Sequence, residues 1–164
     1  MNVIIHDLPG RDRLEELLGP MNDDDKIIER KDKDPVPCMG CFGCWIKTPG
    51  MCVIKDGFED TGAYMGAAQE LRIVSRCTYG EFSPFVKKVL DRSISYCHPY
   101  FVKRDGETHH KMRYTNTLKI RVLAYGDNLT DDEKECMRSR AIAMGRNLGT
   151  NDVEINFITE SMEN

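Results

Sequence analysis

Hydrophobic positions fall into short runs and helix-spaced sets that follow one another along most of the chain. Apolar runs predict strands at 3–5, 26–30, 71–74, 118–125 and 153–158. Apolar residues spaced three or four positions apart predict helices at 11–18, 58–69, 84–94 and 131–148. Because strand and helix alternate, we expect a parallel sheet with helices on both faces.

Two of the helices carry clear signals at their ends. Ser83 is expected to cap the third helix, with Pro84 at its first position. Thr130 and Glu133 have the spacing of a capping box, and Gly149 is expected to end the last helix.

The segment 97–116 departs from this alternation. Two strand-like halves flank Asp105-Gly106, which is a strong turn signal. The pattern predicts a β-hairpin or a long ordered loop that leaves the sheet. With 164 residues, the chain 1–164 is expected to form a single domain.

The overall charge narrows the classes of partner. The chain has 27 acidic and 23 basic residues and a net charge of −4, which disfavours nucleic acid as a partner. No apolar stretch approaches the roughly 20 residues that span a bilayer, so no membrane association is expected. The N-terminus lacks the pattern of a secretion signal. We therefore expect a soluble, cytoplasmic protein.

The most distinctive stretch of the sequence is rich in cysteine. Four of the seven cysteines follow the spacing C-x2-C-x2-C-x7-C, at Cys38, Cys41, Cys44 and Cys52. Glycines and a proline separate them, which predicts a tight loop rather than a regular helix. Such a loop suits an iron–sulfur cluster, a zinc ion, or no metal at all, with reduced cysteines packed as small hydrophobic residues. Disulfides are disfavoured by the odd cysteine total and the absence of a signal peptide.

Parallel sheets bind ligands beyond the carboxyl ends of their strands. Three loops are expected at that edge, at 7–11, 75–82 and 125–130. We expect the cysteine loop to leave the second strand at the same end. The sequence thus predicts one site at one edge, to which all four loops contribute.

Two stretches resemble a known family. Residues 37–45 read PCMGCFGCW, and Gly50-Met51-Cys52 follows. Residues 75–83 read SRCTYGEFS, and Lys87, Asp91 and Arg92 come next. In this order and spacing, the residues resemble the cysteine-containing branch of the flavodoxin-like NAD(P)H-dependent FMN reductases.

The resemblance implies a flavodoxin-like three-layer α/β sandwich with five parallel strands in the order 2-1-3-4-5, here without the C-terminal helix. It also implies FMN at the sheet edge and NAD(P)H as co-substrate. The implied cofactor-binding residues are Gly10, Arg11, Cys77, Thr78, Tyr79, Gly80, Tyr125, Gly126 and Asp127. Iron–sulfur flavoproteins of the same superfamily hold a [4Fe-4S] cluster on a compact cysteine motif, which implies Cys38, Cys41, Cys44 and Cys52 as metal ligands.

The chain departs from the family pattern at two places. The first loop has no hydroxyl group, Pro9 lacks an amide proton, and Asp7 and Asp12 would repel a phosphate. Only Gly10 and Arg11 favour phosphate there, so weak FMN binding is expected. The missing C-terminal helix is expected to leave an apolar sheet face uncovered, which predicts a homo-oligomer.

The leading hypothesis is a flavin-dependent oxidoreductase that passes electrons from NAD(P)H through FMN to an unknown acceptor. No catalytic residue is assigned, because the flavin carries the chemistry. One alternative is an iron–sulfur electron-transfer or sensor protein that uses Cys38, Cys41, Cys44 and Cys52. The other is a flavodoxin-like scaffold that has lost its cofactor.

Overall fold

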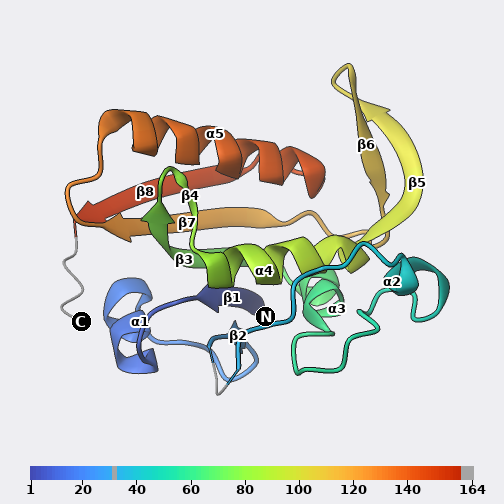
Figure 1. The fold of residues 1–164 in the computed structure, drawn as a ribbon, viewed down its shortest axis with the longest axis horizontal. Coiled ribbons are helices and arrows are strands. Elements are labelled where there is room, and N and C mark those ends of the chain that lie inside the picture. Colours follow the sequence, from blue (N-terminus) through green and yellow to red (C-terminus); the bar gives the residue numbers. More distant parts are fainter. Residues whose placement is uncertain (31–32, 160–164) are drawn as a thin grey trace.

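A computed structural model of the chain describes residues 1–30 and 33–159. Its main sheet has five parallel strands in the order β2-β1-β3-β7-β8, the arrangement expected for a flavodoxin-like chain (Figure 1). The parallel strands are β1 (Asn2–His6), β2 (Lys26–Ile28), β3 (Glu70–Thr78), β7 (Lys119–Gly126) and β8 (Val153–Thr159). A short antiparallel strand, β4 (Glu81–Phe82), pairs with the end of β3.

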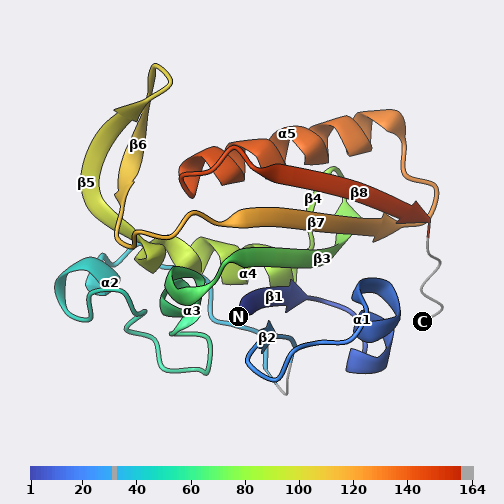
Figure 2. The ribbon, with the colours of Figure 1, turned by 180° about the vertical axis from the view of Figure 1, so that it is seen from behind.

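Helices cover the two faces of the sheet unequally. They are α1 (Arg11–Leu18), α2 (Gly43–Ile46), α3 (Thr61–Ala67), α4 (Pro84–Arg92), the 3₁₀ helix η1 (Ser93–Tyr96) and α5 (Asp131–Asn147). The larger core joins α3, α4 and α5 to one sheet face and includes Ile73, Phe85 and Met137. On the opposite face, α1 covers a smaller cluster around Leu14. In Figure 2, α1 lies near the β1 side of the sheet and α5 near the β8 side.

The predicted helix starts are confirmed. The Ser83 hydroxyl accepts a hydrogen bond from the Val86 amide at 3.4 Å, with Pro84 at the first helical position. Thr130 and Glu133 form the reciprocal capping box of α5. The cysteine loop contains one helical turn, α2, where the sequence predicted irregular structure.

The segment after η1 forms an antiparallel hairpin of β5 (Cys97–Arg104) and β6 (Glu107–Met112). Its turn residues Asp105 and Gly106 both have positive φ, 51° and 83°. The hairpin projects from the body of the molecule beside the carboxyl end of α5 (Figure 1). The Arg104 guanidinium donates to the Arg146 carbonyl at 3.0 Å, which holds the hairpin against that helix end.

On the sheet face opposite the larger core, charged residues occupy the amino half, whereas Leu123 in the carboxyl half packs with the smaller apolar cluster. Register places Arg72 beside Arg121, and Arg121 beside Glu154. Arg121 forms ion pairs with Asp152 at 2.7 Å and with Glu154 at 3.4 Å. The face expected to be apolar is therefore only partly so. The homo-oligomer itself stays a prediction.

Within residues 1–30 and 33–159, no helix has the length and apolar character needed to cross a membrane.

Candidate cofactor site

Three loops meet at the carboxyl edge of the sheet, and Asp7 ties them together. Its carboxylate accepts hydrogen bonds from the Arg76 amide at 3.1 and 3.2 Å. The Tyr125 hydroxyl donates to the same carboxylate at 3.1 Å. These bonds connect the ends of β1, β3 and β7, so the three loops predicted at this edge do converge. In the sequence, only the position of Asp7 directly after β1 points to this role.

The turn between β3 and β4 presents an exposed aromatic ring. Tyr79 has a left-handed backbone with φ 53°, and its side chain is 90% exposed. Gly80 follows with φ 77°, and a Cβ there would lie 2.7 Å from the Cys136 Cβ. Only glycine fits this position, because both the backbone angle and the packing against α5 exclude a side chain. The turn is thus a fixed platform beside the start of α5.

The neighbouring predicted residues divide into backbone and core positions. Thr78 ends β3 and Gly126 ends β7, so their backbone groups reach the edge. Asp127 is exposed just beyond. The Cys77 side chain is buried in the core, and this burial raises the pKa of its thiol. Cys77 can therefore serve a ligand at this edge only through its backbone.

The loop expected to hold a phosphate is open but weakly cationic. Gly10 is the N-cap of α1, and a Cβ built there would meet no described atom within 4 Å. Arg11 is the nearby cation, but it pairs with Glu29 at 2.8 Å. Glu29 also lies 3.5 Å from Nε2 of the buried His6. Burial is the main reason that the pKa of His6 is lowered, so this ring favours its neutral form.

These residues fit FMN at one end better than at the other. The Tyr79-Gly80 turn offers an aromatic surface and exposed backbone groups for a ring system. At the phosphate end, the first amides of α1 are available, but Asp7 keeps a carboxylate nearby. The fit agrees with a flavin held mainly by its ring.

The cysteine loop does not join this edge, which corrects the sequence-based expectation. Helix α4 starts beside β3, where the Ser83 amide donates to Ser75 Oγ at 2.9 Å, and runs back toward the amino ends of the strands. The segment that contains Asp34 contacts this helix, because Asp34 pairs with Lys88 of α4 at 3.0 Å. Helix α2 consequently lies at the end of the molecule opposite α1 (Figures 1 and 2). The single site predicted for all four loops does not form.

A buried arginine anchors the cysteine loop at this far end. The Arg92 side chain is 1% exposed and forms an ion pair with Asp56. It also donates to the carbonyls of Ile54 at 3.0 Å and Val36 at 3.4 Å. Burial is the largest single influence on the Asp56 carboxyl and raises its pKa. The hydrogen bonds from Arg92 and from the Val36 and Phe58 amides together outweigh burial, so the pKa is lowered. The sequence identified Arg92 only as part of a family-like helix pattern.

The four cysteines are neighbours without forming a metal site. Cys38 and Cys41 are exposed, Cys44 is half-buried and Cys52 is buried. Burial raises the pKa of Cys44, and the nearby thiols, led by Cys52, raise it further. In the part of the chain that the structure describes, no group of three or more His, Cys, Asp or Glu side chains is arranged to hold a metal ion. The [4Fe-4S] and zinc interpretations of this loop are thus not supported.

Comparison with known proteins identifies the fold. No protein-family model matches the sequence, and neither does any curated protein. Among solved structures, an FMN-dependent NADH-azoreductase from Bacillus anthracis str. Ames Ancestor, in complex with FMN, superposes with a TM-score of 0.59. The identity is 14%, over 96% of this chain and 86% of that one. The chain has a flavodoxin-like fold.

Two further structures give the same result. An azoreductase from Bacillus anthracis str. Sterne has a TM-score of 0.60 at 9% identity, over 96% of this chain and 86% of that one. An NAD(P)H:quinone oxidoreductase from Methanothermobacter marburgensis has a TM-score of 0.59 at 13% identity, over 96% of this chain and 85% of that one. At such low identity, the flavodoxin-like fold is what these neighbours have in common with this chain.

Proposed function

We propose that this chain is a flavin-dependent oxidoreductase that binds FMN at the carboxyl edge of its sheet. NAD(P)H is the electron donor, and an unidentified acceptor receives the electrons. The observation that carries the proposal is the convergence of three loops through Asp7, beside the exposed Tyr79. Two structural neighbours, an FMN-dependent NADH-azoreductase and an NAD(P)H:quinone oxidoreductase, support it.

Each loop has a different part in the proposed site. The Tyr79 ring and the Thr78 and Gly80 backbones would contact the flavin ring, with Tyr125, Gly126 and Asp127 along its other side. Gly10 and Arg11 would face the phosphate. Bound FMN supplies the hydride and electron chemistry, and the protein positions it and limits access of water. Because Asp7 and Pro9 weaken the phosphate end, we expect low affinity.

FMN binding tests this proposal directly. The purified chain is titrated with FMN while quenching of flavin fluorescence is followed, and NAD(P)H oxidation is then measured on the loaded protein. Replacing Tyr79→Ala should weaken FMN binding roughly two- to tenfold, since aromatic stacking contributes roughly 0.5–1.5 kcal/mol. Tyr100→Ala is the matched control, because Tyr100 is 66% exposed but lies on the distant hairpin. Equal FMN affinities for the two variants would contradict the proposed location.

The cofactor-free scaffold is the second candidate function, and the carboxylate of Asp7 beside the α1 N-terminus favours it. A chain that shows no FMN binding at millimolar concentration would support the scaffold. The iron–sulfur alternative has only the cysteine spacing in its favour. A visible spectrum of anaerobically purified protein separates it from the others, because a cluster gives a broad brown absorbance that FMN does not.

A further inference from the structure

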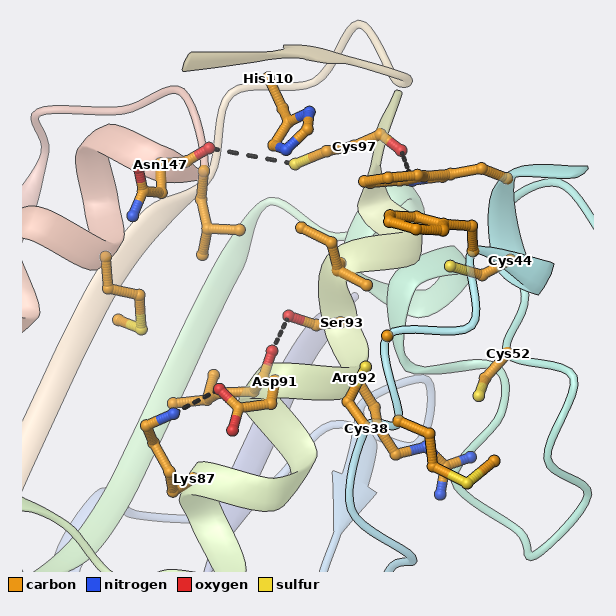
Figure 3. A pocket seen from close by; sticks show the side chains of 18 of the residues that line it. Cys38, Cys44, Cys52, Lys87, Asp91, Arg92, Ser93, Cys97, His110 and Asn147 are labelled. Carbon is orange, nitrogen blue, oxygen red and sulfur yellow. Dashed lines mark hydrogen bonds and ion pairs between the residues drawn. The ribbon is translucent and has the colours of Figure 1, made fainter. Parts of the chain in front are cut away.

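A cavity of about 530 Å³ lies between α4, α5, the cysteine loop and the hairpin (Figure 3). Small-molecule sites typically have volumes of roughly 300–1,000 Å³, with mostly apolar walls and a few polar groups. Leu90, Met144 and Leu148 supply apolar walls here. The lining reaches Glu81 and Phe82 at one end but includes neither Asp7 nor Tyr79 among the described residues. The cavity therefore borders the turn of the proposed flavin site and extends away from it.

One wall of the cavity is aromatic and held in place. Phe42 and Trp45 stack with ring centroids 5.4 Å apart and an interplanar angle of 22°. The Trp45 indole donates to the Cys97 carbonyl at 3.0 Å, which fixes its orientation. His110 comes from the hairpin and lies 5.1 Å from the Trp45 ring. Fixed rings of this kind favour a flat aromatic ligand, which gains stacking contacts at little cost in side-chain entropy.

Two polar atoms of the lining residues lack partners. His110 Nδ1 and Arg92 Nε are buried and form no hydrogen bond to any described residue. In Figure 3, His110 hangs over the cavity from the hairpin side. Leaving a buried polar atom unpaired costs roughly 1–3 kcal/mol, so a ligand group that bonds to it gains that much. Arg92 Nε can only donate, and this favours a ligand that carries an acceptor group.

The remaining charges around the cavity are balanced. Lys87 pairs with Asp91 on α4. Arg140 of α5 lies 3.7 Å from the Glu81 carboxylate. The Arg92 guanidinium pairs with Asp56 behind the wall. With these charges offset, the cavity suits a ligand that is neutral or carries one negative charge.

We propose that this cavity binds a flat aromatic molecule of one or two fused rings that carries a hydrogen-bond acceptor. The rings pack against the wall formed by Phe42 and Trp45, and the acceptor meets one of the two unpaired nitrogens. The proposal does not depend on flavin binding, and its test uses no flavin.

The probe is 8-anilinonaphthalene-1-sulfonate, which has an aromatic body and one anionic acceptor group and fluoresces in apolar sites. Met144→Trp fills the cavity from α5 and should weaken probe binding at least tenfold. Ile142→Trp is the matched control, since Ile142 is on the same helix but 44% exposed to solvent. It should bind the probe like the unmodified chain. Equal affinity in the two variants, or no saturable binding, would overturn the proposal.

A second arm remains valid if Met144→Trp fails to fold. His110→Phe keeps a ring at the aromatic wall but removes the unpaired nitrogen, and it should weaken probe binding several-fold. An outer groove is the competing location, and Ile46 and Phe101 line it together with Phe42, Trp45 and His110. Because His110 lines both places, Ile46→Ser is the variant that separates them. Loss of probe binding in Ile46→Ser would place the probe on that outer surface and overturn the proposal.

The cysteines provide an independent readout of where the probe sits. Cys44 lines the cavity, whereas Cys136 is an exposed residue of α5 beside Gly80. Bound probe should slow maleimide labelling of Cys44 several-fold and leave Cys136 unchanged, as measured by peptide mass spectrometry. Equal slowing at both thiols, or slowing at Cys136 alone, would contradict binding in the cavity.

Discussion

The two ends of the sheet are built in different ways. At the carboxyl end, the loops follow directly from β1, β3 and β7, and a few hydrogen bonds to Asp7 hold them together. At the opposite end, the cysteine loop is held by Arg92, which belongs to a helix far away in the sequence. Strand direction determines the first arrangement, whereas side-chain contacts between distant segments determine the second. This difference separates the proposed flavin site from the cysteines.

The largest effect is expected from the anchor of the cysteine loop. Arg92→Met leaves Asp56 without its partner, and breaking a buried pair costs about 3–5 kcal/mol. Urea unfolding should show this loss of stability. The control is Arg121→Met on the open sheet face, where a partly exposed pair contributes roughly 0–1 kcal/mol. Similar losses of unfolding free energy in both variants would show that the Arg92–Asp56 pair stabilises the fold no more than a surface ion pair does.

A smaller effect is expected at the carboxyl edge. Gly80→Ala places a Cβ in a left-handed position and against Cys136, so the turn must shift. The left-handed backbone alone costs roughly 1–2 kcal/mol, and the contact adds to it. The proposed FMN affinity should fall as well, because the turn moves.

Gly106→Ala at the hairpin tip provides the control for Gly80→Ala. Gly106 has φ 83°, but a Cβ there meets no described atom within 4 Å. Gly106→Ala should therefore lose only the unfolding free energy that the left-handed backbone costs, without any change in FMN affinity. A stability loss as large as that of Gly80→Ala would mean that the contact with Cys136 contributes nothing.

The smallest effect is a pH dependence at the same edge. Burial lowers the pKa of His6 below its ordinary value of 6.5, so the unfolded chain binds this proton more readily than the folded one. The contribution of neutral His6 to the free energy of unfolding is therefore fully present above about pH 6.5 and is lost as the pH falls below that value. His6→Phe should flatten this part of the curve of unfolding free energy against pH. His109→Phe, on the hairpin, should leave it in place.

Most of the fold was predictable because it depends on local signals. The apolar runs, the Ser83 cap and the Thr130–Glu133 capping box specified strands and helix starts, and their alternation indicated a parallel sheet. The order of the strands came from the family resemblance. The position of the cysteine loop was not predictable in this way. It depends on Asp34 meeting Lys88 and on Arg92 meeting Asp56, which are contacts between distant segments.

The charged sheet face could have been anticipated. Arg72 and Arg121 each alternate with apolar neighbours in their strands, which places both on the face opposite the larger core. No sequence signal predicts the unpaired nitrogens of His110 and Arg92. Whether a buried nitrogen finds a hydrogen-bond partner depends on how the chain folds around it.

Hydrogen–deuterium exchange with and without FMN tests the central claim most directly, because one experiment reports on both ends of the sheet. FMN should slow amide exchange in the loops at 7–11, 78–82 and 125–130, and leave 38–54 unchanged. Protection confined to 38–54 would contradict the proposed flavin site and place the cofactor at the cysteine end.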